Sequence, residues 1–72
     1  TATISYSLPT SEHVSIVVYN SIGKEVAQLV SERKDAGTYR VKFHGENLSS
    51  GIYIYRLQAG AFTETKKMML VK

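Results

Sequence analysis

The sequence predicts an all-β protein, a small antiparallel immunoglobulin-like β-sandwich of six to seven strands. Several short segments alternate apolar and polar residues with the period of two that marks a strand with one buried face. Turn-forming Gly, Pro, Asn and Asp residues interrupt these segments every roughly 8–12 residues, a spacing typical of sandwiches. The chain has 72 residues, of which 43% are hydrophobic. We therefore expect one domain, residues 1–72, with a single core.

Two strands are expected before the first glycine of the chain. Residues 1–8 form the first, which Pro9 ends because proline has no N–H to donate. Residues 13–19 form the second, and because both of its faces are largely apolar, we expect it to be a central strand. A turn at residues 20–23 follows, since Asn and Gly tolerate left-handed backbone. The side chains expected to face the core are Ile4, Tyr6, Leu8, Val14, Ile16 and Val18.

Residues 24–34 are compatible with two structures. Val26, Leu29 and Val30 have the i, i+3, i+4 spacing of an amphipathic helix, and the segment contains good helix formers. The segment is short, lacks a clear helix stop signal and lies in a chain of strands. We therefore favour a strand over roughly residues 25–30, with a helix as the alternative.

Residues 38–44, after a turn at residues 35–37, show the sharpest alternation in the sequence, and the outward-facing side chains of this strand are basic. We expect Tyr39, Val41 and Phe43 to face inward, and Arg40, Lys42 and His44 to face outward. A polar loop, residues 45–51, leads from this strand to the last third of the chain.

The chain ends in a predicted β-hairpin of residues 52–57 and 62–71, joined by residues 58–61. Gly60 supplies the positive φ angle that a tight hairpin requires. One face of the first strand carries Tyr53, Tyr55 and Leu57. In the last strand, the residues of one parity are Phe62, Glu64, Lys66, Met68 and Leu70.

The positive charge of the chain is concentrated after Gly51. The cations of this segment are Arg56, Lys66, Lys67 and Lys72 and its carboxylate is Glu64, which together account for the whole formal net charge of +3. We place the function on the basic last strand. If that strand lies at a sheet edge, its unpaired backbone groups can bind a partner strand, while the lysines set specificity and encounter rate. Protection of the edge against self-association is the alternative role of these lysines.

Residues suited to catalysis or metal binding are sparse. The chain has no Cys, and its two histidines, His13 and His44, stand beside turns and are expected to be structural or exposed. Glu46 beside His44 falls short of the three or four clustered ligands of a zinc site. Ser49, His44 and Asp35 supply the residue types of a Ser-His-Asp triad, but without a nucleophile elbow. We therefore predict that the protein is not an enzyme and uses no metal or cofactor.

Two other binding functions and an inert spacer are the competing interpretations. A nucleic-acid surface would combine Arg40, Lys42 and Arg56 with Tyr53 and Tyr55. A net charge of +3 is low for such a domain, and the tyrosines alternate as core residues do, so we expect no nucleic-acid partner. Carbohydrate binding through exposed tyrosines is the second alternative.

No segment approaches the roughly 20 consecutive apolar residues of a membrane helix, so no direct membrane insertion is expected. The chain opens TATISYSLP, without the charged start and apolar stretch of a signal peptide. Either the domain stays where it is made, or it belongs to a larger polypeptide whose export signal lies far upstream. Because Thr1 is followed almost directly by a strand, we expect the second.

Five motifs together resemble a known family over essentially the whole chain. They are Thr3-Ile4-Ser5-Tyr6-Ser7-Leu8-Pro9, Val17-Val18-Tyr19-Asn20 with Gly23 and Val26, Ala36-Gly37-Thr38-Tyr39, Leu48-Ser49-Ser50-Gly51-Ile52-Tyr53-Ile54-Tyr55-Arg56-Leu57, and Lys66-Lys67-Met68-Met69-Leu70-Val71-Lys72. The combination resembles the type A C-terminal sorting domain of the type IX (Por) secretion system, which is similar to the immunoglobulin-like domain of the flagellar hook-capping protein. Relatives often carry an aromatic-Asp-Gly turn after the fourth strand, where this chain has Phe43-His44-Gly45. The Asn-Pro-rich opening of relatives is also missing, so we expect the chain to begin just inside the family's boundary.

The resemblance implies a signal on a larger exported cargo protein, which passes through the periplasm and is read at the outer membrane. The implied partners are the outer-membrane translocon and a sortase-like peptidase, which removes the domain and leaves the cargo at the cell surface or outside the cell. The expected receptor contacts are Lys66, Lys67, Met68, Leu70, Val71 and Lys72, with Gly51 at a family-motif turn. The alternative is a non-catalytic accessory module that binds carbohydrate, acts as a spacer or assembles as a hook cap does.

Overall fold

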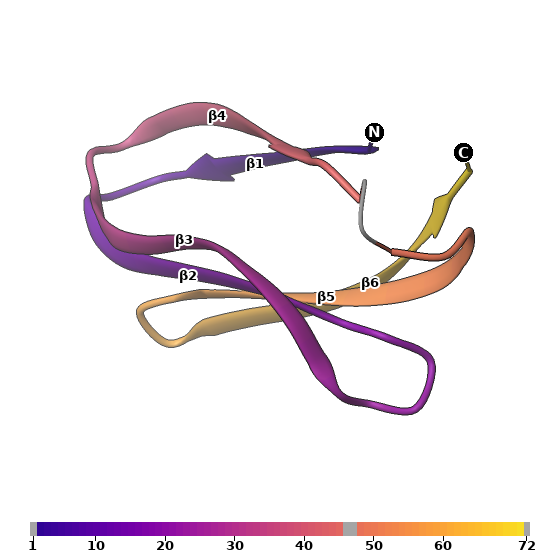
Figure 1. Ribbon diagram of the computed structural model, residues 1–72. Coiled ribbons are helices and arrows are strands. Elements are labelled where there is room, and N and C mark those ends of the chain that lie inside the picture. The colour runs from indigo at the N-terminus through magenta and orange to yellow at the C-terminus, as the bar shows by residue number, and fades with distance from the viewer. Residues whose placement is uncertain (1, 46–47, 72) are drawn as a thin grey trace.

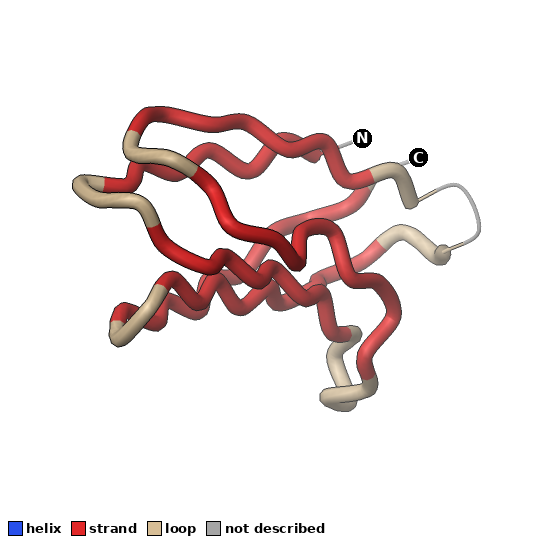
Figure 2. Tube along the Cα trace, turned by 90° about the vertical axis from the view of Figure 1, so that its left-hand side faces the viewer, coloured by secondary structure: helices blue, strands red, loops and turns tan. Residues whose placement is uncertain are grey.

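The described residues form six antiparallel strands in two facing sheets (Figure 1), which confirms the predicted all-β sandwich. The structure is a computed structural model and describes residues 2–45 and 48–71. The strands are β1 (Ala2–Leu8), β2 (Glu12–Tyr19), β3 (Glu25–Lys34), β4 (Gly37–Phe43), β5 (Gly51–Ala59) and β6 (Phe62–Leu70). Turns and short loops connect them, and every regular element among the described residues is a strand (Figure 2). The described residues include no helix long and apolar enough to cross a membrane.

The two sheets differ in size. β1 and β4 form a two-stranded sheet, which lies over a four-stranded sheet of order β3-β2-β5-β6 (Figure 1). As expected from its two apolar faces, β2 is a central strand, and β5 is the other. β3 and β6 are the edge strands of the larger sheet. The expected second strand is thus confirmed both in position and in role.

The segment that was compatible with a helix is strand β3, and it extends through Lys34, four residues beyond the expected end. Its register with β2 is irregular at two places: Val30 pairs with Ile16, Gln28 with Val17, and Glu25 with Tyr19. Leu29 and Val26 therefore have no direct partner on β2 and sit at β-bulges. Because each bulge shifts the side-chain alternation by one residue, the apolar residues acquire a spacing that looks helical.

The core lies between the two sheets and is built from the alternating residues of the strands. One group of buried side chains comprises Ile4, Tyr6, Leu8, Val14, Ile16, Leu57 and Ala59. A second group, at the other end of the sandwich, comprises Val18, Phe43, Tyr53 and Leu70. Phe43 and Tyr53 meet edge to face there, with ring centroids 6.1 Å apart. The last strand thus contributes directly to the core.

A Gly-x-Tyr motif opens two strands in the same way. Gly37 and Gly51 are the first residues of β4 and β5 and have φ angles of 150° and 154°, which side-chain-bearing residues rarely adopt. Two residues later, the Tyr39 hydroxyl donates to the carbonyl of Asp35 at 2.6 Å, and the Tyr53 hydroxyl donates to that of Ser49 at 2.7 Å. Each tyrosine therefore fastens its strand to the preceding turn, as in the tyrosine corner of immunoglobulin-like sandwiches.

Candidate functional site

The terminal hairpin is tighter than the sequence indicates. β5 extends to Ala59, which pairs with Phe62, so the turn is only Gly60 and Ala61. Gly60 has a φ of 61°, the positive angle that a type II′ hairpin turn requires at its first central residue. The pairing then continues without a register shift to Gly51 and Leu70. Side chains of β5 and β6 therefore lie in fixed rows across the hairpin.

Strand β6 lies at the edge of the four-stranded sheet, hydrogen-bonded to β5 on one side only. Recognition by strand addition requires a strand in this position. An edge strand presents a row of unpaired backbone N–H and C=O groups, which can pair with another strand unless charge or geometry prevents it. Lys66 and Lys67 are both exposed on this strand.

The side chains of β6 that share the parity of Leu70, its inward row, change from buried at Leu70 to exposed at Phe62. Leu70 is 2% exposed and belongs to the core, and Met68 packs against both core groups. Lys66 Nζ lies 2.9 Å from Glu64 Oε1, and the hydrogen bond to this carboxylate raises the pKa of Lys66. Phe62 has the same parity but is 54% exposed. Of the expected contact residues, Leu70 thus directs its side chain into the core and not to the surface.

The outward row of β6 presents a different surface. Met69 and Lys67 lie beside Ile52 and Ile54 of β5, respectively, and Met69 is 65% exposed. Neither Met69 nor Ile52 is among the receptor contacts expected from the sequence, although the alternation of the two strands already separates Met69 from Met68 and Leu70. Their shared parity with Lys67 and with Arg56 is the signal that identifies them as surface residues. Val71, just after β6, is 70% exposed, and Lys72 lies outside the described residues.

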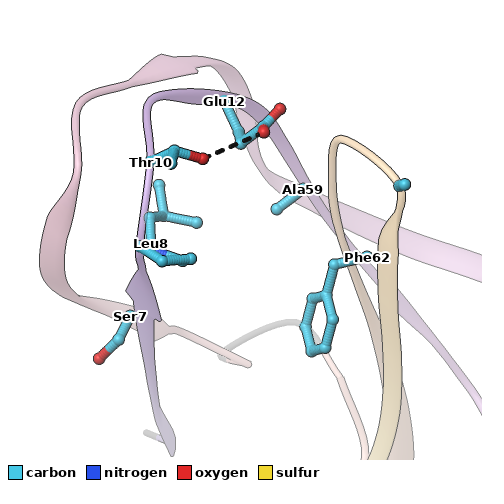
Figure 3. Close-up of a pocket in the computed structure, with 8 residues that line it drawn as sticks. Ser7, Leu8, Thr10, Glu12, Ala59 and Phe62 are labelled. Atoms are coloured by element: carbon cyan, nitrogen blue, oxygen red, sulfur yellow. Dashed lines mark hydrogen bonds between the residues drawn. The ribbon is translucent and has the colours of Figure 1, made fainter.

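An open cleft of about 380 Å³ separates β1 from the turn of the hairpin (Figure 3). Leu8 and Ala59 line it from the two sheets, and Phe62 stands on its far wall (Figure 3). Glu12 accepts a hydrogen bond from the Thr10 hydroxyl at 3.3 Å, and its carboxylate contacts the position that a side chain at Gly60 would occupy.

A family comparison matches the entire chain. The family model described as secretion system C-terminal sorting domain covers residues 1–72. The chain belongs to this family. Neither a curated protein nor a solved structure matches it significantly.

As a type IX C-terminal sorting domain, the chain is a signal that directs an exported protein to the cell surface or the extracellular space. Membership also implies that it interacts with the type IX secretion machinery and is joined to a cargo domain upstream. Domains of this family are generally non-catalytic.

The sorting domain separates the residues of the Ser-His-Asp set. Asp35 precedes β4 and His44 follows it, so the length of a seven-residue strand, roughly 3.3 Å per residue, lies between them. Asp35 accepts a weak hydrogen bond from Ser11 at 3.5 Å. No group of three or more metal-ligating side chains occurs among the described residues, and Glu46 lies outside them.

The residues weighed for nucleic-acid or carbohydrate binding do not share a surface in the sorting domain. Arg40 and Lys42 are exposed on β4 of the smaller sheet, whereas Arg56 is exposed on the larger sheet. Tyr53 is buried, and its hydroxyl is bonded to Ser49. All five tyrosines lie in the described part of the chain, and each is buried or half-buried.

Proposed function

We propose that the type IX machinery recognises this sorting domain as a folded β-sandwich, by contacts to its terminal hairpin, while the domain crosses from the periplasm to the cell surface. The position of β6 carries the proposal. A strand at a sheet edge, with exposed lysines and its pairing groups free on one side, is suited to addition of a partner strand.

The anchoring of β6 supports recognition of the folded state. Leu70 is held in the core with Phe43 and Tyr53, and Met68 packs beside them. The hairpin is therefore ordered before a receptor binds, and less conformational entropy is lost on binding than for a disordered tail. A receptor that serves many unrelated cargoes can then read one rigid shape.

The receptor contacts proposed from the exposed residues are Lys66, Lys67 and Val71, with Lys72 as a fourth outside the described residues. Met68 and Leu70 hold the strand in place from the core side. The outer-membrane translocon binds the hairpin first, and a sortase-like peptidase then removes the domain from its cargo.

A fusion experiment tests the proposal. The 72-residue chain is fused to the C-terminus of an exported reporter in a bacterium with a type IX system, and reporter activity outside the cell is measured. The unmodified chain is expected to place the reporter outside, shortened by the mass of the domain. The variant Lys66→Glu/Lys67→Glu reverses two charges on β6 and is expected to trap the reporter in the periplasm.

Lys24→Glu/Lys42→Glu is the matched control, since it reverses two exposed lysines away from β6. It is expected to be exported normally. Equal export of both double variants would reject recognition through β6, and retention of the unmodified fusion would reject the sorting function of this chain. An exported reporter of full mass would reject removal by the peptidase.

A further inference from the structure

The outer face of the terminal hairpin carries a contiguous apolar and basic surface. We call it the outer patch and define it by six residues: Tyr19, Ile52, Ile54, Arg56, Lys67 and Met69. The register fixes their arrangement: Tyr19, Ile54 and Lys67 form one row across three strands, and Ile52 pairs with Met69 in the next. Arg56 Cζ lies 5.5 Å from the centroid of the Tyr19 ring, so this cation closes the patch on its other side.

The apolar part of the outer patch is exposed. Ile52 is 48% exposed and Met69 is 65% exposed, although they are direct neighbours on paired strands. Ile54 and Tyr19 beside them are half-buried. Adjacent exposed apolar side chains on the outer face of a sheet, bordered by cations, provide a candidate surface for binding another molecule.

The carboxylates of the larger sheet lie mostly elsewhere. Glu12 and Glu32 have the inward parity of β2 and β3, and Glu64 has the inward parity of β6. Glu64 is also engaged by Lys66. Glu25, opposite Tyr19, is the carboxylate that borders the patch. The alternation of the strands therefore leaves a basic outer patch on a chain of modest net charge.

We propose that the outer patch binds an acidic, partly apolar surface of a protein of the export machinery. This inference rests on the proposed function and adds a second contact surface to it. Carboxylates of the partner would pair with Arg56 and Lys67, and its apolar side chains would cover Ile52 and Met69. Tyr, Met and Arg are the residue types enriched in protein–protein interfaces, and all three occur here.

The number of cations favours a protein over an anionic membrane surface. Lipid-binding segments typically gather about four to eight Lys or Arg residues, because each contributes only about 1 kcal/mol near an anionic bilayer. The outer patch has two, one of which is held over an aromatic ring. Two cations beside apolar side chains suit specific pairing with carboxylates in a partly desolvated interface.

A binding experiment tests the chemistry of the patch. The isotope-labelled 72-residue chain is titrated with a short peptide of alternating Glu and Leu, and amide chemical shifts are followed by NMR. Shifts are expected at Ile52, Ile54, Lys67 and Met69, and they are expected to weaken in high salt because exposed charges are screened. Equal shifts at Lys42 on the other sheet, or tighter binding to phosphatidylglycerol vesicles than to the peptide, would overturn the proposal.

Variants on β5 separate the outer patch from the β6 edge. Both sides of β5 are already paired, so its residues cannot act through strand addition. Ile52→Thr/Arg56→Glu is expected to weaken peptide binding and export by about tenfold, the factor that corresponds to about 1.4 kcal/mol. Ile22→Thr/Arg40→Glu makes the same changes at exposed positions elsewhere and is expected to behave as the unmodified chain.

Thermal unfolding of both variants checks that they remain folded at the assay temperature. If Ile52→Thr/Arg56→Glu is poorly folded while its control is folded, Arg56→Gln is used instead. It removes the charge without changing an apolar residue and is also expected to lower export. If the unmodified fusion and the patch variants are all exported normally, the proposal that the outer patch binds a partner is rejected, while the proposed sorting function stands. Failure of the unmodified fusion would instead reject the proposed function.

Discussion

Gly45 packs directly against Leu70, and this contact joins the loop after β4 to the end of β6. A Cβ atom on residue 45 would lie 3.0 Å from Leu70 Cδ1 and 3.2 Å from its Cγ, and closer still to Cδ2. Leu70 is 2% exposed and cannot move into solvent to make room. Gly45 is thus required by packing, whereas the neighbouring His44 is exposed.

Gly45→Ala is therefore expected to destabilise the domain by about 1–3 kcal/mol, the usual cost of overpacking a core. Urea unfolding measures this change. The control is the same substitution in a Leu70→Ala background, where the added methyl group has space and should cost much less. Equal costs in both backgrounds would show that the contact with Leu70 is not the cause.

Tyr6→Phe is expected to stabilise the domain by about 1 kcal/mol, because it removes a buried polar group that has no protein partner. The Tyr6 hydroxyl is buried without a hydrogen-bond partner among the described residues. Its ring stacks on that of Tyr39, with centroids 5.4 Å apart, and phenylalanine keeps this contact. A lower unfolding free energy for Tyr6→Phe would contradict this explanation.

The same substitution should change the response to alkaline pH. Burial is the main cause that raises the pKa of Tyr6 above its ordinary value of 10.0, with Lys34 opposing it and Tyr39 and Glu32 adding to it. The folded state therefore holds this proton to higher pH than the unfolded state. The free energy of unfolding is therefore fully retained below the unfolded pKa and falls as pH rises from there through the folded pKa, because the unfolded state ionises first. Across that pH range, the free energy of unfolding should fall less steeply for Tyr6→Phe than for the unmodified chain.

Much of this fold could be predicted from period-two alternation, because strands such as β1 and β4 bury one face only. β3 was ambiguous because the bulges at Val26 and Leu29 break that period, and a bulge is visible only in the pairing with β2. The outer patch was missed for a related reason. All three residues of the run Met68-Met69-Leu70 are apolar, so their composition does not show which side chains are buried; the strand parity that Met69 shares with Lys67 assigns it to the surface, and Leu70 to the core.

Tyr53→Phe is expected to have the opposite sign to Tyr6→Phe. The Tyr53 hydroxyl donates to the Ser49 carbonyl at 2.7 Å in a partly buried site, so its loss should cost about 0.5–1.5 kcal/mol. Comparing the two variants by urea unfolding provides an internal control, since both remove one hydroxyl group from a buried tyrosine. A stabilising effect of Tyr53→Phe, like that expected for Tyr6→Phe, would show that the hydrogen bond to Ser49 contributes nothing measurable.

Leu70→Ala and Val71→Ala should separate the structural from the recognition role of the chain's end. Leu70 is buried among Val18, Phe43 and Tyr53, so its truncation should cost about 2–5 kcal/mol. Val71 is 70% exposed, and its truncation should change stability by less than about 0.5 kcal/mol. Deleting residues 68–72 removes Leu70 as well, so a loss of export after that deletion would reflect unfolding as much as lost contacts. A stable Val71→Ala domain with reduced export would place a receptor contact at Val71, whereas a stable and fully exported one would confine recognition to residues other than Val71.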